Sequence, residues 1–315
     1  MKPRPAVLCP VDFSDASRGA LRYGRAIARH FGTRLVILAV EDPLLTEAID
    51  LGTGVVWNPE DTRHELAKFD RKVLHGNPLE GVDVHYHVAV GKPAKQIVHG
   101  AQQEACDLIV MSTHGLTGMR KLFFGSTTER VLRETTIPVL ATPPREDGPA
   151  DLEDASRSVG HILVPVDLTP TSLHQIQVAR GLSEALHVPL IATHVLEPVR
   201  SPLAEKLHLP SIEVERKARA EKALGELLAT VPQQLHPEAL VAYGDPAEEI
   251  AKIARDRQAG LIVVGLHGSP MLGPRMGSVT YRILCLAPAL VLALPPEAAA
   301  MAPQVRAHAR GVVHK

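Results

Sequence analysis

The sequence has few aromatic residues and no surplus of charge of either sign. Phe, Trp and Tyr make up 3% of the 315 residues, which leaves few platforms on which single-stranded bases could stack. The 34 Lys and Arg residues are balanced by 35 Asp and Glu residues, so the chain has no overall positive field that would attract nucleic acid. We therefore expect no nucleic-acid partner.

Cysteines are also scarce, and they do not form a metal-binding pattern. Cys9, Cys106 and Cys285 are far apart in the sequence. Cys9 and Cys106 stand in or beside apolar runs, which predicts small buried side chains. The 16 histidines show no ligand spacing either, so the sequence predicts no metal site.

Long hydrophobic runs are missing. No apolar stretch reaches the roughly 20 residues that a membrane-spanning helix requires, and the first residues contain no apolar signal segment. On this basis we expect a cytoplasmic protein without a membrane partner.

Three motifs of well-known enzyme classes are missing as well. The chain has no Gly-x-x-x-x-Gly-Lys-[Ser/Thr] loop, no Gly-x-Gly-x-x-Gly after its first apolar run and no Gly-x-Ser-x-Gly elbow. No nucleophile is accompanied by a recognisable base and orienting group. We predict that the protein is not an enzyme, with slow ATP hydrolysis as the most it would catalyse.

What the sequence does contain is an internal repeat. The segment 9–14 (CPVDFS) returns as 164–169 (VPVDLT). Two later pairs, His114-Gly115 and Gly125-Ser126, return in the same order as His267-Gly268 and Gly277-Ser278. The offset is 155 residues between Asp12 and Asp167 and 152 residues between Gly125 and Gly277. We predict two copies of one domain within residues 1–146 and 160–297, joined by a linker at 147–159 and followed by a flexible tail at 298–315.

Each copy alternates short apolar runs with helical segments, which predicts an α/β fold with a doubly wound, mostly parallel sheet. Helix starts are indicated by Ser14, by Thr169 followed by Pro170, and by the prolines of Gly91-Lys92-Pro93 and Gly244-Asp245-Pro246. Ser126-Thr127-Thr128-Glu129 has the spacing of a capping box.

Ligands of doubly wound sheets bind beyond the carboxyl ends of the strands. Asp12 and Asp167 follow the first strand of each copy, and a glycine-rich loop follows the fourth. Glycines let backbone amides approach phosphate, and a helix that begins after the loop adds its positive N-terminus. Charged loop residues, Arg120, Lys121 and Arg275, add positive charge there.

Each of these features also has a structural alternative. The glycine loop could be a simple strand-to-helix connection, and the two aspartates could bond their own turn. His114 and His267 could donate to phosphate or face solvent.

These features together resemble the universal stress protein family. Its pattern is Gly-x-x-Gly, nine residues and then Gly-[Ser/Thr] after the fourth strand, with an Asp at the end of the first. The resemblance covers residues 6–145 (copy one) and 160–296 (copy two). It implies a five-stranded parallel sheet of order 3-2-1-4-5 in each copy, an ATP site with or without Mg²⁺, and pairing through the last strands. That pairing could form a pseudo-dimer within one chain or a homodimer.

The resemblance also implies which residues surround the nucleotide. In copy one they are Pro10, Asp12, Val40, Met111, Ser112, Gly115, Gly125, Ser126 and Thr127. In copy two they are Pro165, Asp167, Val195, Gly265, Gly268, Gly277, Ser278 and Val279.

Both copies depart from the pattern. Copy one has Ser112 where the first glycine is expected. Copy two has Gly265 there, but only eight residues separate Gly268 from Gly277, and two of them are Pro270 and Pro274. We therefore expect ATP to bind copy one better than copy two.

The leading function is an ATP-binding stress-response protein whose nucleotide alters the binding of an unidentified protein partner. The alternatives are a nucleotide-independent interaction or chaperone-like protein and a nucleotide hydrolase or transferase.

Overall fold

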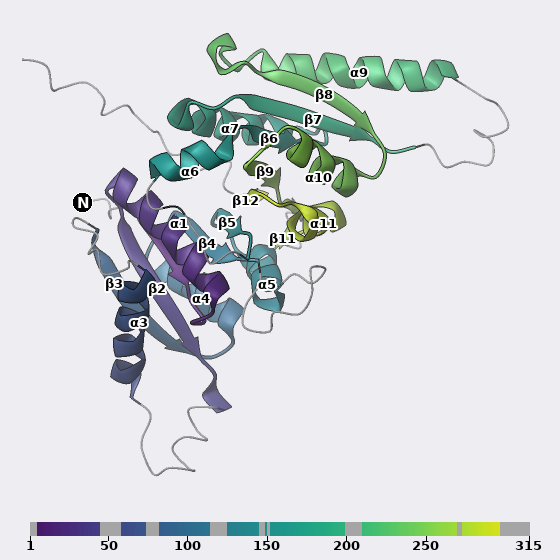
Figure 1. Cartoon of the computed structure of the whole chain (residues 1–315). Coiled ribbons are helices and arrows are strands. Elements are labelled where there is room, and N and C mark those ends of the chain that lie inside the picture. The colour runs from purple at the N-terminus through teal and green to yellow at the C-terminus, as the bar shows by residue number, and fades with distance from the viewer. Residues whose placement is uncertain are drawn as a thin grey trace, which may run out of the picture.

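The structure is a computed structural model that describes residues 5–44, 58–73, 82–113, 125–144, 149, 152–198, 210–269 and 273–296. Strands and helices alternate through both copies (Figure 1). The elements of copy one are β1 (Ala6–Pro10), α1 (Asp15–Phe31), β2 (Arg34–Glu41), α3 (Pro59–Val73), β3 (Val84–Val90), α4 (Pro93–Gln103), β4 (Leu108–Ser112), α5 (Ser126–Glu134) and β5 (Val139–Thr142).

Copy two repeats this order after a connecting helix, α6 (Leu152–Val159). Its elements are β6 (Ile162–Pro165), α7 (Ser172–Leu186), β7 (Leu190–Leu196), α9 (Pro210–Leu228), the 3₁₀ turn η1 (Gln233–Leu235), β8 (Glu238–Tyr243), α10 (Pro246–Asp256), β9 (Leu261–Gly265), β10 (His267–Ser269), β11 (Gly273–Arg275), α11 (Ser278–Leu286) and β12 (Leu290–Leu294).

The ten long strands form one continuous sheet. Its order is β3-β2-β1-β4-β5-β12-β9-β6-β7-β8, so each copy has the predicted order 3-2-1-4-5, and its strands run parallel. The two halves meet at β5 and β12, which pair antiparallel with Leu140 opposite Leu292. The predicted pairing of the last strands therefore occurs within one chain and covers both strand edges.

Helices cover both faces of this sheet, and each face has one hydrophobic core that runs through both copies. The helices α4, α5, α10 and α11 pack on one face, with Ile97 and Ile250 among the buried residues. The helices α1, α3, α7 and α9 pack on the other face, where Leu21 and Ile176 are buried. Because both hydrophobic cores continue across the β5–β12 junction, each core contains buried apolar residues of both copies.

Most helix starts follow the predicted chemistry. Ser14 caps α1 by accepting a hydrogen bond from the Ser17 amide, and prolines occupy the first turns of α4 and α10. The prediction for α7 was wrong, because this helix begins at Ser172 rather than at Pro170. The Thr169 hydroxyl bonds the Asp167 carboxylate at 2.7 Å and the Thr171 hydroxyl at 2.8 Å, and the cap position of α7 falls to Thr171, which makes no side-chain cap bond.

The segment predicted as a linker contains the helix α6, which the sequence did not indicate, and α6 lies against α1. The domain boundaries themselves stay predictions. Within the described residues, no helix is both long and apolar enough to cross a membrane.

Copy one has a buried ion pair between helices α1 and α3. Arg25 and Asp70 are 4% and 2% exposed; Arg25 Nε lies 2.6 Å from Asp70 Oδ1, and the Tyr86 hydroxyl donates to Asp70 Oδ2 at 2.8 Å. Cys9 is buried beside this pair, and its burial, with a smaller contribution from Asp70, raises the pKa of its thiol far above the ordinary value. Burial likewise raises the pKa of Cys106 to about 12, so both cysteines are inert buried side chains, as predicted.

Candidate functional site

The strand register brings the predicted copy-one residues to one edge of the sheet. Pro10 pairs with Leu38, so Asp12, which follows the end of β1, lies at the same level as Val40 near the carboxyl end of β2. On the other side of β1, Leu8 pairs with Ile109, which places the Met111–Ser112 end of β4 beside them. This is the position where the strand order reverses, and it is the ligand-binding position of doubly wound folds.

Asp12 shapes the turn that leaves β1. Its Oδ1 accepts hydrogen bonds from both the amide and the hydroxyl of Ser14, with the amide at 3.1 Å. Phe13, between them, has φ of 63°, a left-handed conformation that a bulky residue rarely adopts. Such strain is typical of positions fixed by a functional or tightly bonded turn. The turn-bonding role considered for Asp12 is thus present.

The glycine-rich loop of copy one is closed at its base. The Gly125 amide donates to the Thr113 carbonyl at 2.8 Å, and the Thr128 hydroxyl donates to the Ser112 carbonyl at 2.8 Å. These bonds hold the start of α5 beside the end of β4. His114, Gly115, Arg120 and Lys121 lie outside the described residues.

Helix α5 begins at Ser126, as predicted, but not with a capping box. Gly125 occupies the cap position, and no side chain caps the helix from there. The Glu129 side chain bonds Arg133 at 3.1 and 2.9 Å instead of turning back to the helix start. The first-turn amides therefore have no cap from a side chain at the cap position, which suits an anion at this end. Thr127 lies in the same first turn.

In copy two the corresponding aspartate also bonds its own turn. Asp167 Oδ1 accepts from the Thr169 amide at 3.0 Å, from the Thr169 hydroxyl at 2.7 Å and from the Ser172 hydroxyl at 3.1 Å. Leu168 repeats the left-handed conformation of Phe13, with φ of 62°. The register again places Asp167 and Val195 at one level, because Pro165 pairs with Thr193.

The copy-two loop contains a feature that the sequence did not predict. β10 and β11 pair antiparallel, with His267 opposite Arg275 and Gly268 opposite Pro274, and β11 lies against α5 of copy one (Figure 1). The shorter loop thus folds on itself. Gly277 takes the cap position of α11, followed by Ser278 and Val279 in its first turn.

A large side chain fills the space behind the first glycine of copy two. A Cβ added to Gly265 would lie 3.2 Å from the Gln175 side chain, which is 6% exposed and donates to the Pro165 carbonyl at 3.3 Å. At the same positions copy one has Ser112 and Ala20. The two copies therefore fill one space in opposite ways, with a glycine and a glutamine or with a serine and an alanine.

His194 is a second polar group of copy two that sequence reasoning missed. Its Nδ1 lies 2.8 Å from the Val166 carbonyl oxygen, which can only accept, so Nδ1 carries the proton. Ala39 holds this position in copy one. Comparing the copies residue by residue would have singled out both Gln175 and His194.

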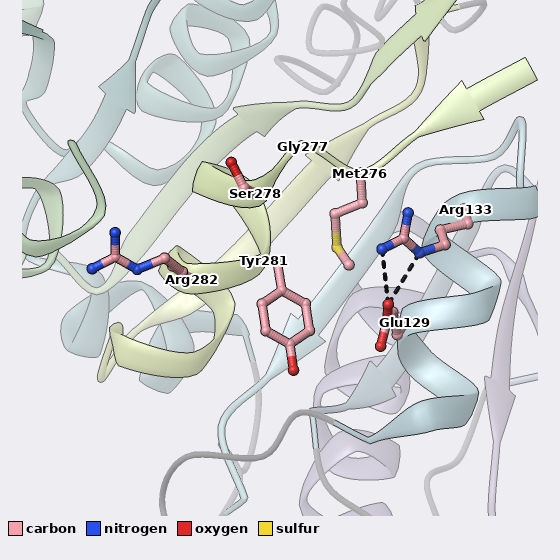
Figure 2. A pocket seen from close by; sticks show the side chains of 7 residues that line it. All are labelled: Glu129, Arg133, Met276, Gly277, Ser278, Tyr281 and Arg282. Atoms are coloured by element: carbon pink, nitrogen blue, oxygen red, sulfur yellow. Dashed lines mark hydrogen bonds and ion pairs between the residues drawn. The ribbon is translucent and has the colours of Figure 1, made fainter. Parts of the chain in front are cut away.

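A cavity of about 500 Å³ lies between the two halves, away from the aspartates. Figure 2 shows the Tyr281 ring and the Met276 thioether between α11 and the Glu129–Arg133 pair of α5. Its lining residues are Glu129, Arg133, Met276, Gly277, Ser278, Tyr281 and Arg282. Only Gly277 and Ser278 belong to the set predicted from the sequence, so this cavity does not coincide with the nucleotide site expected at the strand ends.

Comparison with known sequences gives the same family for both halves. The profile of the Universal stress protein family matches residues 4–143 and again residues 159–295. Universal stress protein MJ0531 of Methanocaldococcus jannaschii is 32% identical over 136 residues, 42% of this chain and 79% of that protein. Universal stress protein YxiE of Bacillus subtilis is 30% identical over 142 residues, 42% of this chain and 95% of that protein.

Solved structures share the two-copy fold. A functionally unknown protein from Pseudomonas aeruginosa PAO1 matches with a TM-score of 0.62 and 18% identity over 94% of both chains. A universal stress protein from Archaeoglobus fulgidus matches with a TM-score of 0.61 and 17% identity, over 92% of this chain and 96% of that one. Since the family profile covers both copies, the chain belongs to the universal stress protein family.

Proposed function

We propose that this protein is a stress-response regulator that binds ATP in copy one and acts through the bound nucleotide. The observation that carries the proposal is the convergence of Asp12 and the start of α5 at the edge where β1 and β4 end, held by the Gly125–Thr113 hydrogen bond. A carboxylate there can accept from a ribose hydroxyl, and first-turn amides can donate to phosphate.

The adenine nucleotide is expected to bring its own Mg²⁺, held through the phosphates. Among the described residues, no three His, Cys, Asp or Glu side chains gather as a metal site. Nucleotide bound at the loop would change the surface that a partner protein meets. The cytoplasmic location and a homodimer of such chains stay predictions.

Copy two supports a different role. Gln175 fills the space behind Gly265, three groups bond Asp167 Oδ1, and the shortened loop forms β10 and β11. We propose that copy two binds nucleotide more weakly and serves mainly as the partner that completes the sheet.

The test is an equilibrium titration of nucleotide-free protein with ATP and Mg²⁺ that counts the sites per chain. Gly125→Val and Gly277→Val form a matched pair, because both glycines have φ near −65° and extended ψ, values that valine adopts without strain (−61° and 127°; −67° and 159°). We expect one micromolar site, removed by Gly125→Val and kept by Gly277→Val.

The opposite result, a single site lost only in Gly277→Val, would reverse the ranking of the copies. No binding up to millimolar ATP would overturn the nucleotide proposal and favour the nucleotide-independent interaction protein. Circular dichroism of each variant shows whether a loss of binding comes with a loss of fold.

A further inference from the structure

The first turns of α4 and α10 occupy equivalent positions but carry opposite charges. Helix α10 starts with Asp245 at the cap and Glu248 in its first turn, and Asp245 Oδ1 accepts from the Glu248 amide at 3.1 Å. Helix α4 has Lys92 at the cap and Lys95 in its first turn, with no side-chain cap. Only the acidic set matches the positive end of a helix.

The neighbouring helix adds a third charge. Arg282 is the fifth residue of α11, and its guanidinium bonds Asp245 Oδ2 at 2.5 Å and Glu248 Oε1 at 3.1 Å. Arg130 is the fifth residue of α5, which packs on α4 as α11 packs on α10. In copy two these positions hold one arginine bonded to two carboxylates. By the equivalence of the copies, the same three positions of copy one are neighbours, and all three carry positive charge.

None of the three copy-one cations is neutralised within the described chain. Lys92, Lys95 and Arg130 are exposed and form no ion pair with any described residue. The adjacent acid, Glu129, bonds Arg133. Three like charges, two of them at a helix start, repel one another and the helix dipole, so copy one gives up stability that copy two keeps. Local rules broken in this way are typical of functional sites.

We infer that Lys92, Lys95 and Arg130 form a second anion site in copy one that takes an oligophosphate group. Two ammonium groups and a guanidinium match the charge and the hydrogen-bonding capacity of phosphate oxygens. Arg130 lies four residues after Ser126, on the same side of α5, so the site adjoins the proposed nucleotide loop.

Two sources of this group fit the same chemistry. One is the distal phosphates of a nucleotide seated at Gly125 and Ser126, in which case the site deepens and rests on the proposed function. The other is a free oligophosphate, which does not depend on nucleotide binding.

The experiment is calorimetric titration of the full chain with inorganic tripolyphosphate at low ionic strength. The variant Lys92→Asp/Lys95→Glu gives these two positions of α4 the residues that α10 has at Asp245 and Glu248. The control Lys68→Glu/Lys72→Asp makes the same change in net charge on α3, which packs on the opposite face of the sheet. We expect the α4 variant to bind about tenfold or more weakly, and the control to bind as the wild type does apart from a small general charge effect.

A second readout separates binding from folding. Without phosphate, the α4 variant should melt about 2 °C higher than the wild type, because the new carboxylates suit the helix start and can pair with Arg130. Equal losses of affinity in both variants, or no tripolyphosphate binding by the wild type, would overturn the site.

The source is resolved with nucleotides and with Gly125→Val. If the distal phosphates of ATP occupy the site, the α4 variant loses affinity for ATP but not for AMP. If the ligand is free oligophosphate, ATP and tripolyphosphate bind together. Tripolyphosphate that still binds Gly125→Val would uphold this site even where nucleotide binding fails.

Discussion

Copy one and copy two have the same strand order and register, yet they place their polar groups differently. Copy one buries Arg25 against Asp70. The equivalent residue of copy two, Arg180, is partly exposed and bonds Glu184 and the Thr230 carbonyl. The sheet topology survives these exchanges because it depends on the apolar strand faces. The polar groups are free to diverge, so the functional difference between the copies lies in them.

The same contrast holds at the strand ends. Copy one has a glycine loop of full length, has Ala20 where copy two has Gln175, and carries three cations at α4 and α5 that form no ion pair with the residues that the structure describes. Copy two fills the corresponding space with Gln175, folds its loop on itself and pairs its charges. This contrast is the basis for the proposal that copy one binds the ligand and copy two completes the sheet.

The largest effect should come from breaking the buried ion pair. Asp70→Ala leaves the Arg25 guanidinium buried without its carboxylate, so we expect a loss of about 3 to 5 kcal/mol in the free energy of unfolding. Arg180→Ala, at the matching position of copy two, should cost less than about 1 kcal/mol because its ion pair with Glu184 is open to solvent, with the two side chains 41% and 46% exposed. Chemical denaturation measures both.

Replacing the pair as a unit sharpens this result. Arg25→Met/Asp70→Leu should recover most of the stability lost in Asp70→Ala, since no unpaired charge stays buried. A loss below about 1 kcal/mol in Asp70→Ala would mean that Arg25 reaches water in solution, contrary to its 4% exposure.

A smaller loss of stability is expected from changing Gly265, which packs against Gln175 in copy two. Gly265→Ala places a Cβ 3.2 Å from the buried Gln175 side chain, and we expect a destabilisation of about 1 to 3 kcal/mol from overpacking. The double variant Gly265→Ser/Gln175→Ala, which copies Ser112 and Ala20 of copy one, should recover much of the lost stability. Thermal unfolding of the single and double variants gives the coupling.

Gly181→Ala is the matched control for this pair. Gly181 lies in α7 with no atom within 4 Å of its added Cβ, so alanine should leave stability unchanged or raise it slightly. If Gly265→Ala behaves like Gly181→Ala, Gln175 does not hold the position that the structure gives it.

The smallest effect concerns the start of α10. Hydrogen bonding from Arg282 is the main cause that lowers the pKa of Asp245 below its ordinary value. The stabilisation is therefore present above the unfolded-state pKa, near 4, and is lost as the pH falls through the lower folded-state pKa. Asp245→Ala should cost about 1 kcal/mol at pH 7, as for other cap residues, and almost nothing at pH 2.

Melting temperatures between pH 2 and pH 7 check this prediction. Lys92→Ala serves as its counterpart in copy one, where no side-chain cap is lost and little change is expected. A pH-independent difference between Asp245→Ala and the wild type would show that the capping carboxylate is not the source.

Much of the fold could be predicted from local sequence signals. Apolar runs gave the strands, prolines and Ser14 gave three helix starts, and the repeat gave equivalent positions in the two halves. The predicted start of α7 was wrong because the chain makes a further turn before the helix, in which the Ser172 amide donates to the Thr169 carbonyl, and no local propensity shows where such a turn ends. Of the candidate site, the register brings Asp12, Val40 and Met111 together, while ligand contact stays a prediction.

By itself, the sequence determined that two equivalent α/β units follow one another, because strand and helix patterns and glycine positions are local properties of the chain. Only the tertiary structure decided that β5 and β12 join them into one sheet, that Arg25 finds Asp70, and that Gln175 fills the space behind Gly265. The reason is physical: periodicity tells which face of an element is apolar, but the partner that covers it is chosen when distant segments pack together.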